Sequence, residues 1–168
     1  MALTSDRQVW VWGSNHFGQL GLDSLESKGV PSLVRALDGR AVCKLLCGGW
    51  HSAVITETGK MLLWGKNTHG QLGFGDTKTI NFPKINQDLR YQGKIRTAAL
   101  GANHTVVVMV MNKVYAFGDN QYGQLGVDDA QRRPTKDPRE ISDLHLMNIC
   151  QVSAGDQHSV ALSVFGEV

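Results

Sequence analysis

The stretch Gly65-Lys66-Asn67-Thr68-His69-Gly70-Gln71-Leu72-Gly73 decides the fold, because the same pattern occurs three times in the chain. The pattern is G-x-N-x-x-G-Q-L-G, and its other copies are residues 13–21 and 118–126. The copies start 65 − 13 = 52 and 118 − 65 = 53 residues apart. A fixed period of this length is the signature of an array of similar supersecondary units.

A second motif, G-x-x-H-[ST], has the same period. It occurs at residues 48–52, 101–105 and 155–159, with starts 53 and 54 residues apart. Between the two motifs, the apolar stretches 52–56 and 61–64 flank Glu57-Thr58-Gly59-Lys60, which is typical of a β-hairpin with glycine in its turn. Asn112 replaces this glycine in the third copy and also tolerates positive φ. Arg7 replaces it in the first copy, which predicts a different turn there.

Each repeat therefore reads as a unit of β-strands. No segment shows helical periodicity with caps. A repeated four-stranded unit of about 40 to 50 residues is typical of a β-propeller blade. A proline follows each copy of the first motif by ten to twelve residues, which fits an edge strand: Pro31, Pro83 and Pro138. The sequence predicts an all-β chain in which residues 1–168 form a partial propeller of about three repeats.

The joined motifs resemble the repeats of the regulator of chromosome condensation family, over nearly the whole chain from residue 2 to residue 168. The resemblance implies a seven-bladed propeller, of which this chain carries about three repeats. Three blades alone leave two open edges and exposed apolar faces. We therefore expect either a piece of a longer protein or self-association through the open blade edges.

Composition narrows the class of protein. The formal charge is +2, from 17 Lys and Arg against 15 Asp and Glu, so a nucleic-acid partner is not expected. No run of 18 apolar residues predicts a membrane span, and no apolar leader predicts secretion. The three cysteines are expected to be free thiols of a reducing compartment. Together these features predict a cytoplasmic or nuclear protein.

The sequence contains no pattern for bond-making chemistry. The motif G-x-N-x-x-G is not a dinucleotide fingerprint, because no helix follows it to offer its N-terminus to a phosphate. There is no nucleophile elbow, no H-E-x-x-H and no C-x-x-C. Cys47 aligns with Leu100 and Ala154, which predicts a buried position. We expect no enzyme activity, no catalytic residue, no metal and no cofactor.

Two sets of repeated residues are predicted to be structural. His51, His104 and His158 occupy the same position of the second motif. Because a catalytic site rarely needs one residue per blade, we expect each imidazole to hydrogen-bond its own blade's backbone beside the glycine turn. The alternative is a ring of metal-binding or acid/base imidazoles. The aromatic residues that precede the first motif are expected to pack between blades: Trp12, Trp64 and Phe117.

The candidate partner-binding residues are the variable positions of the first motif, since function concentrates in loops held on a rigid frame. They are Ser14, His16, Phe17, Lys66, Thr68, His69, Asp119, Gln121 and Tyr122. The charge-rich stretch 132–140 adds Arg132 and Arg133, as part of a solvated loop or of a contact with an acidic partner or nucleic acid. Polar variation without a selective role is the alternative for all of them.

The function expected from these features is a protein–protein interaction module that recruits a partner or substrate for a larger regulatory protein. The family resemblance implies such modules in HECT-type ubiquitin ligases, certain kinases and ciliary scaffolds, with a ubiquitylation substrate as one partner. The alternative is guanine nucleotide exchange on a small GTPase such as Ran, the activity of the founding member. That activity is thought to use a β-wedge inserted in one blade, for which a period of 52 to 54 residues leaves no room.

Overall fold

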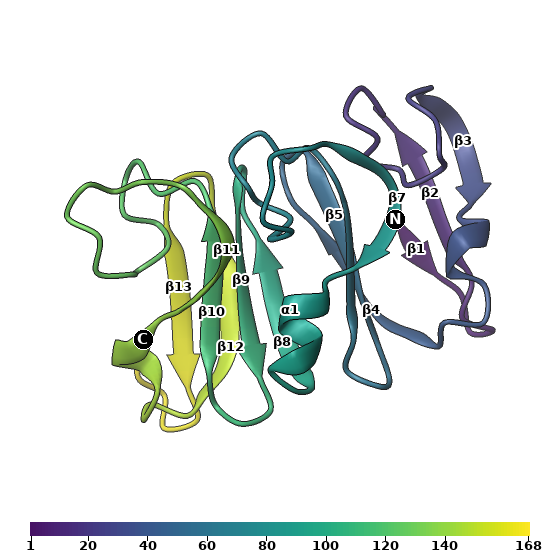
Figure 1. Ribbon diagram of the computed structural model, residues 1–168. Helices are drawn as coiled ribbons and strands as arrows, with labels where there is room; N and C mark the ends of the chain where they lie inside the picture. Colours follow the sequence, from purple (N-terminus) through teal and green to yellow (C-terminus); the bar gives the residue numbers. More distant parts are fainter.

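The computed structural model describes residues 1–168 as a row of four antiparallel sheets that stand side by side like the blades of a fan (Figure 1). The first blade consists of β1 (Ala2–Leu3), β2 (Val9–Gly13) and β3 (Lys28–Leu33). The second consists of β4 (Val42–Cys47), β5 (His51–Thr56), β6 (Met61–Gly65) and β7 (Ile80–Ile85). The third consists of β8 (Ile95–Leu100), β9 (His104–Met109), β10 (Val114–Gly118) and β11 (Thr135–Glu140). The fourth is a pair, β12 (Ile149–Ala154) and β13 (Ser159–Ser163).

Helical structure is limited to three short connections between blades. They are η1 (Arg35–Leu37), α1 (Gln87–Tyr91) and η2 (Ser142–Leu144). None of them is long and apolar enough to cross a membrane. The prediction of an all-β chain with about three blades is confirmed, and the prolines Pro31, Pro83 and Pro138 lie in the outermost strands β3, β7 and β11. Because Thr135–Glu140 forms β11, the interpretation of residues 132–140 as one charged loop is wrong beyond residue 134.

The hairpin turn is the same in every blade. Gly59 and Asn112 have φ values of 75° and 62°, and Arg7 has 70°. The expectation of a different turn at Arg7 is therefore wrong. The Arg7 guanidinium contacts Glu57 at 2.5 Å and donates to the Val42 carbonyl at 3.4 Å. Arg7 thus has the left-handed conformation that glycine adopts without steric strain, and its side chain makes both of these contacts with the second blade.

The hydrophobic core lies between the blades, because each sheet is apolar on both faces. In the middle strands β5, β6, β9 and β10 every residue is buried. Alternate residues face opposite neighbours: Leu62 and Trp64 pack on the first blade, whereas Met61 and Leu63 pack on the third. Each blade thus completes its core only through the blades beside it.

Trp12 does not share the environment of its repeat equivalents. Trp64 and Phe117 are fully buried, but the Trp12 side chain is 46% exposed. In β2, Val9 and Val11 face the second blade, so Trp12 points to the free side of the first blade. The expectation that Trp12 packs between blades is wrong for this chain. Cys47 is exposed as well, because β4 borders the open inner edge of its sheet.

Candidate functional site

Both sequence motifs lie at the same end of the blades. The second motif forms the turn between β4 and β5, and the first forms the loop between β6 and β7. In an antiparallel meander these two connections emerge at one end of the sheet, and the hairpin turns emerge at the other. We call the motif end the loop face. All candidate partner-binding residues belong to it.

The fixed residues of the first motif face inward and hold the loop. Asn15 and Asn67 are fully buried, and their side-chain oxygens accept hydrogen bonds at 2.9 Å from the Leu20 and Leu72 amides. In each copy the glutamine oxygen accepts from the amide two positions earlier, at 2.9 Å: Gln19 from Phe17, Gln71 from His69 and Gln124 from Tyr122. The variable positions are left to point outward.

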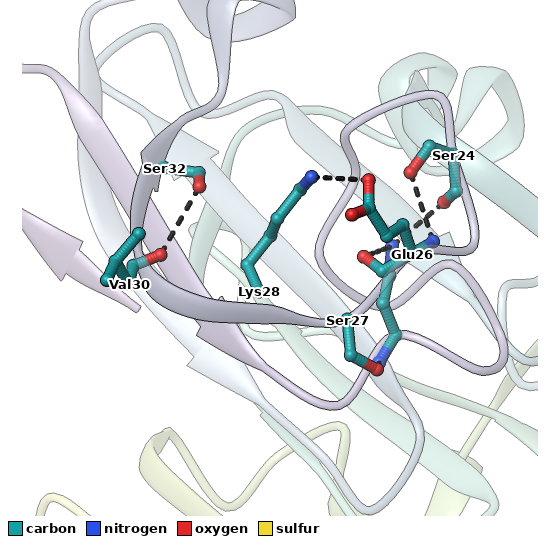
Figure 2. Close-up of polar contacts among 7 residues, drawn as sticks. Ser24, Glu26, Ser27, Lys28, Val30 and Ser32 are labelled. Carbon is teal, nitrogen blue, oxygen red and sulfur yellow. Dashed lines mark hydrogen bonds and ion pairs between the residues drawn. The ribbon is translucent and has the colours of Figure 1, made fainter.

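The first loop shows how the rest of the connection is held (Figure 2). The Asn15 amide group donates to the Ser24 carbonyl at 2.9 Å and to the Glu26 carbonyl at 3.1 Å. Glu26 in turn pairs with Lys28 at 2.6 Å, on the exposed side of the loop. This ion pair lowers the pKa of the Glu26 carboxyl. The loop is therefore ordered from within by Asn15, and its ion pair adds little at the surface.

The candidate residues differ in how far they reach into solvent. Seven of them are exposed: Ser14, His16, Thr68, Gln121, Tyr122, Arg132 and Arg133. Four are half-buried: Phe17, Lys66, His69 and Asp119. Arg132 and Arg133 lie in the connection between β10 and β11, where Arg133 pairs with Asp129 at 3.5 Å. Phe17 and Lys66 come from different repeats and are in contact, with the ammonium 5.4 Å from the ring centroid. Within single loops, Thr68 contacts His69 at 3.1 Å, and the Asp119 carboxylate accepts from the Gln121 amide at 3.2 Å.

Trp50 joins these two residues, and we call Phe17, Trp50 and Lys66 the aromatic cluster. The rings of Phe17 and Trp50 meet edge to face, with centroids 5.4 Å apart and an interplanar angle of 72°. The Lys66 ammonium donates to the Asn103 side-chain oxygen at 3.2 Å, and the Lys66 amide donates to the Trp50 carbonyl at 2.9 Å. Trp50 remains 41% exposed. Residues of the first and second blades thus build one aromatic and cationic surface.

Sequence reasoning left Trp50 out of the candidate partner-binding residues, although its lack of an aromatic counterpart in the other repeats suggested a surface contact. A signal was present, because Trp50 occupies a variable position of the second motif, where the other copies have Asn103 and Gln157. At the boundary between the second and third blades the positions of the aromatic cluster are taken by His69, Asn103 and Asp119. The loop face therefore changes from aromatic and cationic to polar and acidic along the row of blades.

The histidines of the second motif join neighbouring blades. The Thr105 hydroxyl donates to the Gln71 carbonyl at 2.8 Å and contacts Nε2 of His51 at 2.9 Å. Because the hydroxyl proton is already donated, Nε2 of His51 must carry the proton and donate. Ser159 repeats this arrangement, at 2.7 Å from the Gln124 carbonyl and 3.0 Å from Nε2 of His104. The imidazoles thus bond the hydroxyl of the following blade, and the expectation of a bond to their own backbone is wrong.

Burial keeps these imidazoles neutral. Burial, with the nearby His104 and Lys66, lowers the pKa of His51 from 6.5 to about 3. Burial also lowers the pKa of His104, against the opposing effect of the Asp119 carboxylate. His158 is exposed, since no further blade follows it in this chain. No group of three His, Cys, Asp or Glu side chains is placed to hold a metal ion.

Blades arranged in series, joined by repeated contacts and carrying loops at one end, define a propeller-type repeat protein. The chain belongs to the regulator of chromosome condensation (RCC1) repeat family, whose repeat matches residues 6–55, 58–108 and 112–162. The human E3 ubiquitin-protein ligase HERC2 is 35% identical over 163 residues, which cover 96% of this chain and 3% of HERC2. The ultraviolet-B receptor UVR8 of Arabidopsis thaliana is 32% identical over 168 residues, which cover all of this chain and 38% of UVR8.

The fold agrees with a solved member of the family. Prp20p of Saccharomyces cerevisiae, whose structure was described together with its binding to Gsp1p and histones, superposes with a TM-score of 0.85 at 22% identity. The superposition covers 95% of this chain and 40% of Prp20p. The chain thus spans well under half the length of each of these proteins.

Proposed function

We propose that the chain is a non-catalytic protein–protein interaction module whose loop face recruits a partner or substrate for a larger regulatory protein. The observation that carries this proposal is the aromatic cluster. Two aromatic rings and a lysine from adjacent blades form one partly exposed surface on a frame fixed by buried asparagines and glutamines.

Aromatic residues that stay exposed on a rigid frame are typical of binding hot spots. Trp and Tyr are enriched among residues whose truncation costs most in an interface, and they bind with little loss of side-chain entropy. The frame repeats from blade to blade, whereas Phe17, Trp50 and Lys66 do not recur at the other boundary. A surface that differs while its scaffold stays constant is what selective recognition requires.

The relatives support the proposal that such a module serves a larger regulatory protein. HERC2 is an E3 ubiquitin-protein ligase that contains a segment similar to this chain. We propose by analogy that the partner is a protein to be ubiquitylated or otherwise regulated, met in the cytoplasm or nucleus.

The test compares proteins captured by the wild-type chain with those captured by Trp50→Ala and Phe17→Ala. Tyr91→Ala is the matched control, because Tyr91 is an aromatic residue, 83% exposed, in α1 at the opposite end of the blades. A protein captured by the wild type is then purified and titrated against all variants. We expect the two loop-face variants to bind at least about 30-fold more weakly and Tyr91→Ala to bind like the wild type.

A partner that binds all four chains equally would contradict the proposal. A counter-assay addresses nucleotide exchange, by following the release of bound nucleotide from a small GTPase such as Ran. Accelerated release that survives Trp50→Ala would also contradict the proposal, since the chain would then act through another surface and by another activity.

A further inference from the structure

The connection between β10 and β11 differs from its equivalents in the first and second blades. It extends outward from the third blade (Figure 1). Pro138 follows the end of the first motif by twelve residues, whereas Pro31 and Pro83 follow it by ten. The third connection is therefore two residues longer than the others. We call residues 127–134 the arginine loop.

The arginine loop lacks an internal hydrogen bond that the other two connections have. The Asn67 amide group donates to the Asp76 carbonyl at 3.1 Å, and the Asn15 amide group bonds its own connection in the same way. Asn120, their repeat equivalent, is only 1% exposed, but its amide group has no hydrogen-bond partner. The arginine loop can therefore change conformation without breaking a bond to this buried side chain.

The two arginines of the loop are available to another molecule. Arg132 and Arg133 are both exposed, and the Arg132 guanidinium has no acidic side chain within ion-pair distance. The Arg133 side chain is 68% exposed and pairs with Asp129 at 3.5 Å. Because a surface ion pair of this kind contributes little, a carboxylate of another protein can take the place of Asp129.

A threonine hydroxyl follows the arginines at the surface. Pro134 fixes its own φ and favours an extended conformation at Arg133, and Thr135 begins the outer strand β11. The Thr135 hydroxyl donates to the Asp137 carbonyl at 3.0 Å, on the exposed side of the strand. The start of the acceptor segment is thus extended and its hydroxyl lies outside the core.

The strand is also loosely paired at this point. Thr135 is the partner of Gly118, and the next paired residue is Arg139, opposite Ala116, so residues 136–138 lie outside the regular ladder. The other edge of β11 has no partner strand. Another protein can therefore reach the Thr135 hydroxyl without disturbing the buried strands β9 and β10.

We propose that Thr135 is a phosphorylation site for a serine/threonine kinase that selects arginine two and three residues before the acceptor. Thr135 is the one serine or threonine of the chain with arginine at both positions, and its repeat equivalents are Lys28 and Ile80. Acidic side chains of such a kinase would bind the two guanidinium groups, each through paired hydrogen bonds. The site is thus a property of the third repeat alone.

The modification is a phosphoryl transfer from ATP. The Thr135 hydroxyl oxygen forms a bond to the γ-phosphorus, and the bond from this phosphorus to the oxygen that bridges to the β-phosphate breaks. ADP leaves, and the hydroxyl proton passes to the catalytic carboxylate of the kinase.

The phosphate would change the charge of the loop face. Residues 128–137 contain three acidic and three basic side chains, and a phosphate adds a charge of about −1.5 to −2. The Gly75 amide donates to the Lys136 carbonyl at 3.0 Å, and a Cβ on Gly70 would lie 2.7 Å from the Lys136 Cα. The phosphate therefore lies where the second and third blades meet, at the boundary that already carries Asp119.

The experiment incubates the full 18.4 kDa chain with ATP, Mg²⁺ and the catalytic subunit of cyclic-AMP-dependent protein kinase as the probe. Tandem mass spectrometry locates the phosphate, and initial rates give kcat/KM. We expect one phosphoryl group per chain, on Thr135. Thr135→Val should accept none, whereas Thr135→Ser should be phosphorylated at the same position.

The arginines are tested one at a time. Arg132→Gln and Arg133→Gln should each lower kcat/KM at least about 10-fold, because each removes a charged group that the kinase binds. The matched control is Arg139→Gln, which removes an exposed arginine of the same segment that lies after the acceptor and three residues before Ser142. This variant should be phosphorylated at the rate of the wild type. Circular dichroism checks that every variant is folded.

A wild-type chain that gains no phosphate, or gains it on Ser142 or any residue other than Thr135, would overturn the proposal. Phosphorylation of Thr135 at an unchanged rate in both Arg132→Gln and Arg133→Gln would overturn it equally. An equal loss of rate in Arg139→Gln would do the same, since general positive charge and not the position of the arginines would then decide the reaction.

Discussion

Acidification from pH 7 to pH 5 should destabilise the blades, because His51 is buried in its neutral form and bonded to Thr105. Its pKa is lowered to about 3 in the folded chain, against 6.5 as the ordinary value. Between these two values the unfolded chain binds one more proton than the folded chain does. Stability is therefore fully present above pH 6.5 and is lost as the pH falls toward 3.

The magnitude follows from the linkage relation. For an unfolded pKa of 6.5, the change from pH 7 to pH 5 costs about 2 kcal/mol. This figure hardly depends on the folded pKa, because an imidazole with a pKa below about 4 stays unprotonated at pH 5. His104 adds to the loss in the same direction, since burial lowers its pKa too. For a chain of this size such a loss is a large part of the total stability.

Urea unfolding followed by circular dichroism at several pH values measures the effect. His51→Gln removes the titrating ring but keeps an N–H that can reach the Thr105 hydroxyl. Between pH 7 and pH 5 the free energy of unfolding of this variant should fall by about 2 kcal/mol less than that of the wild type. His158→Gln leaves both buried imidazoles in place, so this variant should lose as much stability between pH 7 and pH 5 as the wild type does. If His51→Gln and the wild type lose stability equally, the imidazole is not held neutral at the blade interface and the reasoning fails.

Three further outcomes are expected. Thr105→Val leaves two buried polar partners unpaired and should lower the free energy of unfolding, measured by urea titration, by at least about 2 kcal/mol. The control Thr135→Val removes an exposed hydroxyl and should change this free energy by less than about 0.5 kcal/mol. Gly73→Ala should cost about 1–3 kcal/mol more than Gly39→Ala, because both have positive φ but only Gly73 lies against a ring; equal melting temperatures would contradict this. Cys47 should react with a thiol reagent in the folded chain, and labelling only after denaturation would show it buried.

The fold could be predicted because the period is carried by residues that act within their own repeat. Asn67 and Gln71 bond amides of the same loop, so their spacing alone indicates the turn they make. The prolines mark outer strands for a similar local reason, since an edge strand tolerates a missing amide proton. Local hydrogen bonds leave a local pattern in the sequence.

The environments of individual side chains could not be predicted in this way, because they depend on the neighbouring blade. Trp12 has the same sequence context as Trp64, yet one is 46% exposed and the other is fully buried. Cys47 aligns with apolar residues but belongs to the inner edge strand β4, which has a partner strand on one side only. The candidate Phe17 was found as a variable loop position, but its contact with Trp50 joins two different motifs in two different repeats.

The polar contacts show why alignment of the repeats places interacting residues apart. Ser52, Thr105 and Ser159 each donate to the glutamine carbonyl of the preceding blade. His51 and His104 each bond the hydroxyl of the following second motif, so neither repeat contains both partners of this contact. A residue of this kind is structural only when its neighbouring blade is present. His158 and Trp12 therefore carry the same sequence signal as their equivalents and still face solvent, at opposite ends of the row.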